Sequence, residues 1–412
     1  MGFRFLHAAD LHLDTPFQGL SRVAPALAER LVDASLDALD RLVEVAVEQQ
    51  VLFVVLAGDV YDGADRGLRA QLRLLAATRR LAEAGIGTFI AHGNHDPVDE
   101  GWSAVQRWPD GVHVFPADEV ATHALRAPDG TRVTVSGISY ARRETRENLV
   151  GRFPPPAGDG FHVAVLHANV GDVAEHAAYS PCRLDDLVGT GHDYWALGHI
   201  HRRAILRAAR PLVAYPGNLQ GRSFKPSETG PKGALLVEVA DGEPVTRFVD
   251  LAPIRFEEIA VDVSACEDLG AVCDALVETA EALVGGDRLI VLRARVFGAT
   301  AAYDILVRPE ASDVLTRALG ERGGALPQVH WADLALDVGP PIDLAALRGR
   351  GDLLGELADE ATRLSEDRLA LRGLLAQEEA LRPLLGEMDD AALAALVWRA
   401  AELAVSLLDE EV

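Results

Sequence analysis

The chain has 412 residues, a formal net charge of −24, and 49% hydrophobic and 25% charged residues. This composition is typical of globular domains, and the length predicts two or three of them. The negative charge argues against a general nucleic-acid-binding surface, because phosphate contacts need Lys and Arg. A nucleic-acid substrate would have to be attracted by metal ions, by local arginine clusters or by a partner protein.

The sequence gives no reason to expect a membrane protein. No apolar run approaches the roughly 18–20 residues that span a bilayer, and residues 1–12 lack the apolar core of a signal peptide. The three cysteines, Cys182, Cys266 and Cys273, are odd in number and form no CxxC pair. We therefore expect a reduced, cytoplasmic protein without a disulfide framework.

The first 250 residues alternate between short apolar runs and segments with helical spacing. Strands are expected at 3–8, 51–57 and 88–91, and helices at 26–47 and 68–84. This βαβαβ order favours a largely parallel sheet. Ligand sites of such sheets gather at the carboxyl ends of the strands.

The apolar runs that follow are more strictly of the β type. They span 112–115, 132–138, 162–167, 194–197, 212–215, 234–239 and 245–249. Two sheets would use them all. We therefore expect an α/β (α+β) fold in which two mixed sheets pack face to face and helices flank them.

Two further regions are expected beyond a boundary near Pro253. With the first domain at 1–252, a small β-α-β-α-β domain follows at 253–339 and a helical region at 340–412. The small domain's strands are expected at 256–263, 288–296 and 329–338, and its helices at 267–283 and 311–319.

The last helix is expected to begin with Asp390 as its N-cap. Its apolar residues form one stripe, made of Leu393, Leu396, Val397, Ala400, Leu403, Ala404, Leu407 and Leu408. The stripe has two interpretations, which the sequence leaves open. It packs on the chain's own core, or it belongs to a helix pair that binds a partner.

Five short segments contribute Asp, Asn and His residues, most of them directly after expected strands. They are Asp10-Leu11-His12, Gly58-Asp59, Gly93-Asn94-His95-Asp96, His167 and Gly198-His199-Ile200-His201. Each alone is a weak signal, but their order and spacing together are specific for a two-metal site. In such sites the ions lie about 3.5–4 Å apart and clamp the attacking and departing oxygens of a phosphoester.

The predicted ligands divide between two ions. The first ion takes Asp10, His12 and His201. The second takes Asn94, His167 and His199, while Asp59 is placed to bridge both. Mixed imidazole and carboxylate ligands suit Mn, Fe, Zn or Co better than Mg, which prefers oxygen ligands.

His95 is predicted to be catalytic rather than a metal ligand. Coordination by both Asn94 and His95 would strain the turn, so His95 is expected to face the substrate. It could then protonate the leaving alkoxide or stabilise charge on phosphorus. Asp96 is expected to orient the His95 imidazole.

With these motifs the sequence resembles the calcineurin-like metallophosphoesterase superfamily, and within it the bacterial DNA repair exonucleases of the SbcD and YhaO type. The YhaO-type branch fits better. The resemblance covers residues 1 to about 250 and is carried by the segments His7–Asp14, Ala57–Asp62, Gly93–Asp96, Asp193–His201 and Tyr215–Arg222.

The resemblance implies two Mn²⁺ ions, hydrolysis of a DNA phosphodiester, and a capping domain at about 253–339. It also implies an SMC-like coiled-coil ATPase as partner, for which residues 340–412 could serve. Much of the family has a histidine that positions DNA where this chain has Asp62. The balance between exonuclease and endonuclease activity is therefore open, and Asp62 would repel DNA unless Arg66 or Arg69 pairs with it.

Three candidates for DNA contact are Arg202 and Arg203, which directly follow His201, and Arg222. Two functions compete with a DNA nuclease. One is hydrolysis of a phosphomonoester, a cyclic nucleotide or a phosphoprotein on the same fold. The other is a non-catalytic scaffold subunit of an ATPase complex. The chain has no Gly-rich nucleotide-binding motif, so ATP would have to bind a partner, and a homodimer stays open.

Overall fold

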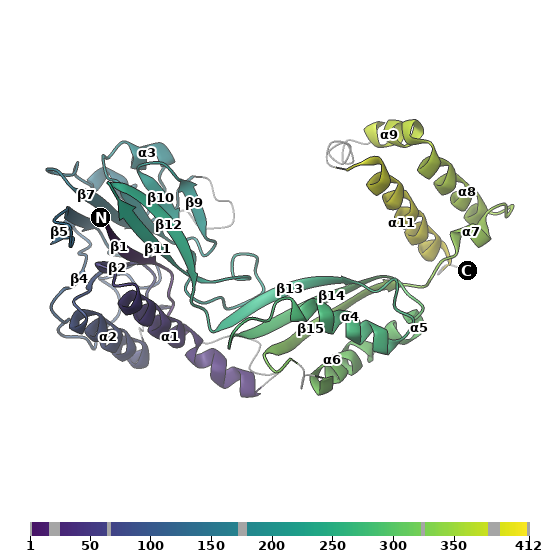
Figure 1. The fold of residues 1–412 in the computed structure, drawn as a ribbon, viewed down its shortest axis with the longest axis horizontal. Coiled ribbons are helices and arrows are strands. Elements are labelled where there is room, and N and C mark those ends of the chain that lie inside the picture. The colour runs from purple at the N-terminus through teal and green to yellow at the C-terminus, as the bar shows by residue number, and fades with distance from the viewer. Residues whose placement is uncertain are drawn as a thin grey trace. The chain divides into compact units, whose positions relative to one another are not determined.

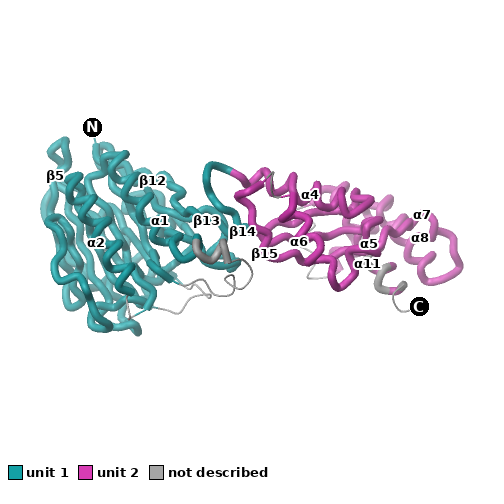
Figure 2. Tube along the Cα trace, turned by 90° about the horizontal axis from the view of Figure 1, so that it is seen from below, with its two compact units in different colours: residues 1–257, 285–291 teal, residues 258–284, 292–412 magenta. Residues whose placement is uncertain are grey.

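The structure is a computed structural model that describes residues 2–15, 25–63, 67–171, 179–322, 326–377 and 388–409. The chain divides into two compact units, shown in different colours in Figure 2. The first unit comprises residues 1–257 and 285–291, and the second comprises 258–284 and 292–412.

The first sheet of unit 1 has the strand order β12-β11-β1-β2-β3-β4 (Figure 1). Its strands are β1 (Gly2–Ala8), β2 (Phe53–Ala57), β3 (Gly87–Ala91), β4 (Val112–Val114), β11 (Gly233–Ala240) and β12 (Glu243–Asp250). The strands β1 to β4 are parallel, whereas β11 and β12 are added in antiparallel fashion. Helices α1 (Pro25–Glu48) and α2 (Leu68–Glu83) supply the crossovers between the first three strands.

The second sheet has the order β5-β6-β7-β8-β10-β9. Its strands are β5 (Ala121–Arg126), β6 (Arg132–Gly137), β7 (Phe161–His167), β8 (Tyr194–Gly198), β9 (Ala204–Arg207) and β10 (Leu212–Tyr215). The short helices η2 (Leu149–Arg152) and α3 (Leu184–Val188) accompany it. Strands β5 and β9 were not predicted from the sequence, because these edge strands are only partly buried and lack a continuous apolar run.

The alternation of side chains along β1 and β2 explains the face-to-face packing of the two sheets. Phe5 and Phe53 point into the core between the sheets, where their rings stack 4.7 Å apart. Leu6 and Val54 point to the opposite face and pack under α1 and α2. Strand β2 is buried along its whole length and gives an unbroken apolar run, and in β1 only Arg4 and His7 interrupt the run, which is why these strands were predictable. The expected sandwich of two mixed sheets is confirmed.

Most of a three-stranded sheet with the order β13-β14-β15 belongs to the second unit. Its elements are β13 (Ile254–Asp262), α4 (Leu269–Glu281), β14 (Leu289–Ala299), α5 (Tyr303–Leu306), α6 (Ala311–Arg322) and β15 (Val329–Gly339). The element order is the expected β-α-β-α-β, with α5 as an unpredicted extra turn. Cys266 and Cys273 are buried free thiols, as is Cys182 in the first unit.

Four described helices complete the chain: α7 (Leu344–Leu347), α8 (Leu353–Glu366), α9 (Arg368–Gln377) and α11 (Asp390–Asp409). The N-cap of α11 is Asp389, whose Oδ1 accepts a hydrogen bond of 2.8 Å from Ala392 N. The prediction of Asp390 is therefore one residue off. Asp390 lies in the first turn and pairs instead with Arg368 and Arg372.

Helix α11 packs on α8 and α9 along a line of residues four apart. Ala401 and Val405 are buried against α8, Leu393 is buried against α9, and Val397 packs against both groups. Of the predicted stripe, only Leu393 and Val397 lie on this line, Ala401 and Val405 were not predicted, and Ala400 is exposed, so packing on the chain's own helices holds for part of the stripe. The side chains of Leu403 and Leu407 lie outside the described residues. Among the helices described, none has the length and hydropathy needed to cross a membrane.

Candidate metal centre

The predicted ligands lie at one edge of the sandwich in unit 1. Asp10, Asp59 and Asn94 follow the carboxyl ends of the parallel strands β1, β2 and β3. His167 is the last residue of β7, and His199 follows β8. Parallel strands place their carboxyl ends at a common edge, which we call the carboxyl edge; the amino edge is the opposite one.

A first group of donor atoms comes from Asp10, His12 and His201, and these atoms lie within 4.8 Å of one another. The Nε2 atoms of His12 and His201 are 3.1 Å apart. Two imidazole nitrogens that face each other so closely point their lone pairs at a common place, as two ligands of one cation do. Glu228 contacts the other ring nitrogen of His201, Nδ1, at 2.6 Å, which leaves Nε2 for the ion.

A second group comes from Asp59, His167 and His199, with donor atoms again within 4.8 Å. His167 Nδ1 donates a hydrogen bond of 3.0 Å to the carbonyl of Ala57, so Nε2 is the ring nitrogen that faces the other donors of this group and would hold an ion. That Nε2 lies 3.0 Å from Asn94 Oδ1 and 3.4 Å from Asp59 Oδ2. Asn94 is thus part of this second group, as predicted.

Asp59 stands between the two groups. Its Oδ2 lies 3.4 Å from His167 Nε2 and 3.9 Å from His12 Nε2, while Oδ1 accepts a hydrogen bond of 2.9 Å from His95 N. Burial raises the pKa of Asp59, but the adjacent His167 and His12 outweigh it and lower the pKa overall. The carboxylate is therefore ionised and placed to bridge two cations. All seven predicted ligands meet here, and their donor set fits two divalent ions.

The backbone at these ligands is unusual. Asp10, His12, Asp59 and His199 all have positive φ, at 52°, 43°, 49° and 104°. Such conformations cost energy for residues other than glycine and cluster at functional sites. The close approach also fixes Gly93, because a Cβ at that position would lie 2.3 Å from Asp59 Oδ1.

His95 lies on the cavity beside the two groups and is held by Asp62. The cavity measures about 500 Å³ and is lined by Asp59, Asn94, His95, His199, His201, Arg222, Lys225, Pro226, Ser227 and Glu228. His95 Nδ1 is 2.8 Å from Asp62 Oδ1, and this contact raises the pKa of His95. Asp62 Oδ1 also lies 3.3 Å from His12 Nδ1.

Asp96 has a different place from the one predicted. It is fully buried, and its Oδ2 accepts a hydrogen bond of 2.9 Å from Val60 N and lies 2.8 Å from His92 Nδ1. Its Oδ1 accepts a bond of 2.8 Å from Gly93 N. Asp96 therefore fixes the turns that carry Asp59 and Asn94. The carboxylate on His95 Nδ1 is Asp62.

The three predicted substrate-binding arginines differ in whether they line the cavity. Arg222 lines the cavity, with one guanidinium nitrogen 3.5 Å from Asp62 Oδ2. Arg203 places its guanidinium 4.0 Å from the ring centre of Phe248 instead. Neither Arg202 nor Arg203 lines the cavity, although both are exposed.

Arg222 also takes the role that the sequence analysis gave to Arg66 or Arg69. Arg69 pairs with Asp14 and Asp33, and Arg66 lies outside the described residues. The charge of Asp62 is therefore balanced by a residue 160 positions away along the chain.

Two further residues of the centre were missed by the sequence analysis. Glu228 holds His201, and Lys232 Nζ donates a hydrogen bond of 3.1 Å to the His201 carbonyl. Burial raises the pKa of Glu228, but the His201 contact outweighs it and lowers the pKa to about 2. Neither residue belongs to a recognised motif. Their position shortly after the Tyr215–Arg222 segment was the only feature of the sequence that could have pointed to them.

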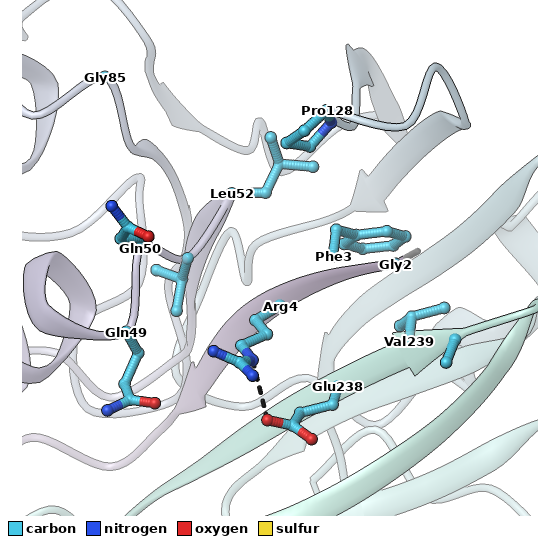
Figure 3. Close-up of a pocket in the computed structure, with 12 residues that line it drawn as sticks. Gly2, Phe3, Arg4, Gln49, Gln50, Leu52, Gly85, Pro128, Glu238 and Val239 are labelled. Carbon is cyan, nitrogen blue, oxygen red and sulfur yellow. Dashed lines mark ion pairs between the residues drawn. The ribbon is translucent and has the colours of Figure 1, made fainter.

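A second cavity, of about 480 Å³, lies at the amino edge of the first sheet (Figure 3). Its lining includes Gly2, Arg4, Gln49 and Glu238, and Figure 3 shows the single ion pair between Arg4 and Glu238, at 2.8 Å. None of the predicted site residues reaches it. The candidate site is therefore the carboxyl edge alone.

The fold and the buried donor set together define a metal-dependent phosphoesterase. Residues 3–203 match the family described as Calcineurin-like phosphoesterase, and residues 256–339 match the one described as Metallophosphoesterase YhaO, middle domain. The chain belongs to the calcineurin-like metallophosphoesterases and carries, after its catalytic fold, the middle domain typical of YhaO.

Three relatives illustrate this placement. Uncharacterized metallophosphoesterase YhaO of Bacillus subtilis (strain 168) is 36% identical over 329 residues, which cover 79% of each chain. DNA double-strand break repair protein Mre11 of Thermoplasma acidophilum is 27% identical over 247 residues, 56% of this chain and 62% of that protein. The SbcD subunit of nuclease SbcCD of Bacillus subtilis (strain 168) is 26% identical over 279 residues, 59% of this chain and 68% of that protein.

Proposed function

We propose that this protein is a two-metal-dependent phosphodiesterase that acts on DNA, as the nuclease subunit of a repair complex with an SMC-like ATPase. One observation carries the two-metal part. Asp59 Oδ2 lies between His167 Nε2, at 3.4 Å, and His12 Nε2, at 3.9 Å, so a single buried carboxylate faces both groups of donors.

When bound, a pair of divalent cations would supply charge stabilisation at phosphorus and a nucleophile that is active at neutral pH. The chain's own residues supply the rest. His95 is placed on the cavity with its Nδ1 fixed by Asp62, so its Nε2 can deliver a proton to the leaving oxygen. Arg222, on the same cavity, can hold a phosphate oxygen.

The names of two relatives support DNA as the substrate. One is a double-strand break repair protein and the other is part of a nuclease, although each matches this chain at under 30% identity. We extend that activity to this chain as a proposal. Arg202 and Arg203, exposed beside His201, would contact the flanking DNA, and Mn²⁺ is the proposed ion.

The ATPase partner is proposed on similar grounds. The SbcD relative is by name one part of a complex, and this chain has no ATP-binding motif of its own. Its helical region at 340–412 offers the surface for such a partner. The proposed division into 1–252, 253–339 and 340–412 assigns catalysis, capping and partner binding to separate regions.

The test compares substrates and ions. With Mn²⁺, the purified protein should cleave linear DNA faster than p-nitrophenyl phosphate, and co-purification from the native host should recover an ATPase. Faster hydrolysis of the monoester, with intact DNA, would instead favour a phosphomonoesterase. Absence of any bound second ion would favour a scaffold.

A variant tests the role of His95. His95→Ala should keep both ions but lose turnover by about 10²–10⁴-fold, because it removes only the proton donor. Metal content by elemental analysis and kcat on DNA measure the two effects separately. Undiminished cleavage in this variant would show that His95 has another role.

A further inference from the structure

The segment from Gly221 to Lys232, which we call the wall loop, is fastened to the metal centre. Glu228 is the main side chain that anchors this loop, and it is 6% exposed. Its Oε1 lies 2.6 Å from His201 Nδ1, and its Oε2 accepts hydrogen bonds of 2.9 Å from Asn218 Nδ2 and from Arg222 N. A side chain that ties a predicted ligand to the start of the loop and to the residues just before it leaves the loop little freedom.

Lys232 fastens the loop a second time. Its Nζ donates hydrogen bonds to the carbonyls of His201 and Ser227. Between these anchors the chain makes a tight turn, in which Glu228 N donates to Lys225 O at 2.7 Å. Gly221 packs so closely that a Cβ there would lie 2.2 Å from the carbonyl of Glu228. The wall loop is therefore an ordered side of the cavity.

The wall loop brings two cations to the cavity, and they differ in how far they are neutralised. Arg222 lies 3.5 Å from Asp62 and 3.9 Å from Glu228, two long contacts that a better acceptor could replace. Lys225 is exposed and forms no ion pair with any residue in the described part of unit 1 or unit 2. An ammonium without a counter-charge at a cavity wall suits an anionic ligand.

The use of lysine in this chain is itself unusual. The sequence has 39 Lys and Arg residues, and Lys225 and Lys232 are its only lysines. Both lie in the wall loop, one buried as a fastener and one exposed on the cavity. Everywhere else the chain uses arginine for positive charge. Two lysines in this one loop of twelve residues mark the wall loop as chemically distinct.

We propose that Lys225 and Arg222 form a subsite for a second phosphate, next to the one that is hydrolysed. The subsite deepens the proposed phosphodiesterase function and rests on it. The preferred substrate is then a nucleotide chain with at least two phosphates, because an isolated monoester or a cyclic nucleotide leaves the subsite empty. A compact ammonium and a planar guanidinium are the side chains that bind phosphate oxygens best.

A comparison of substrates with one and two phosphates tests the subsite. The dinucleotide pdTdT has a second phosphate that dTdT and bis(p-nitrophenyl) phosphate lack. Lys225→Ala should raise KM for pdTdT about tenfold, the usual effect of losing one charge-assisted hydrogen bond, with kcat unchanged. KM for the two substrates with one phosphate should stay the same.

Two variants serve as controls. Lys225→Arg keeps a positive charge and should restore KM for pdTdT, whereas Arg4→Ala removes a cation at the amino edge and should change nothing. An equal rise in KM for substrates with one and two phosphates would overturn the subsite. A wild-type protein without activity on any of these diesters would instead overturn the phosphodiesterase function.

A binding measurement tests the subsite without turnover. Reductive methylation with ¹³C-formaldehyde labels amines and keeps their charge, so lysine signals can come from only two positions. Addition of pdTdT to the labelled, metal-free protein should shift the Lys225 resonance, which Lys225→Ala identifies by its loss. A Lys225 resonance that does not move up to saturation of the dinucleotide would also overturn the proposal.

Discussion

The two edges of the sandwich hold cavities of nearly equal size, about 500 Å³ at the carboxyl edge and about 480 Å³ at the amino edge. Their contents differ. At the carboxyl edge, buried imidazoles and carboxylates converge from five strand ends, and several sit in strained backbone conformations. At the amino edge, one half-exposed ion pair joins Arg4 to Glu238. The convergence of buried donors, and not the volume, distinguishes a site from a surface cavity.

The largest effect is expected from the bridging carboxylate. Asp59→Asn keeps the shape of the side chain but removes the charge that both groups of ligands share. Metal affinity should fall by more than about 100-fold, beyond the loss typical of residues that only support a ligand. Calorimetric titration with Mn²⁺ measures it. Glu238→Gln, at the amino edge, is the matched control and should bind as the wild type does. Full affinity for two ions in Asp59→Asn would contradict the bridging role.

A smaller effect is expected from Glu228. Glu228→Gln weakens the contact that holds His201, so Mn²⁺ affinity should fall by about 10–100-fold while the fold persists. The same titration measures this change, and a circular dichroism melt checks folding. If affinity for both ions is unchanged, Glu228 serves the wall loop alone.

The pH dependence of stability should reveal His7, which lies between the sheets away from both cavities. Its Nδ1 contacts the Tyr194 hydroxyl and its Nε2 donates to the Leu197 carbonyl, each at 3.0 Å. Burial lowers the pKa of His7 from 6.5 to about 3. The unfolded state therefore binds the proton first, and the free energy of unfolding falls as pH drops below about 6.5, by about 2 kcal/mol at pH 5.

The measurement for His7 is urea unfolding across pH, in the wild type and in His7→Gln. The variant is expected to be less stable at neutral pH, but its stability should fall less steeply between about pH 6.5 and pH 4. Parallel pH profiles in the two proteins would show that His7 does not titrate as described. The comparison uses the slope of the unfolding free energy against pH, so the lower stability of His7→Gln at neutral pH does not affect the test.

The smallest effect is expected at the amino edge. Arg4→Ala removes an ion pair whose side chains are 48% and 49% exposed, so the unfolding free energy should change by less than about 1 kcal/mol. Urea unfolding and Mn²⁺ titration together check this. A large loss of metal affinity in this variant would contradict the conclusion that only the carboxyl edge binds metal.

The parts of the fold that sequence predicted best are those with both faces buried. Strands β1, β2 and β3 are mostly apolar, and the residues that follow them carry the ligand motifs, so strand and site were predicted together. The edge strands β5 and β9 escaped because partial exposure breaks the run. Helix α11 was found, but its cap was placed on Asp390 when Asp389 does the capping.

Within the site, the ligands were predictable and their supports were not. Asp96 is adjacent to His95 in sequence, which suggested that the two side chains touch, yet the turn sends Asp96 to His92 and the backbone of Val60. The residue on His95 Nδ1 is Asp62, from the end of another strand. Glu228 supports His201 from 27 positions away. Contacts of this kind depend on which loops meet in space, and the spacing of residues along the sequence does not predict this.

The separation of the ligands along the chain has a consequence for stability. His12 and His201, 189 positions apart, meet at 3.1 Å in the first group. A cation held there would act as a cross-link that closes most of unit 1 into a loop, and such distant contacts form late in folding. Resistance to unfolding should then depend on the free cation concentration, rising by about 2.7 kcal/mol when that concentration reaches about 100 times Kd. A chelator would thus weaken the whole unit, well beyond the few residues that bind the ion.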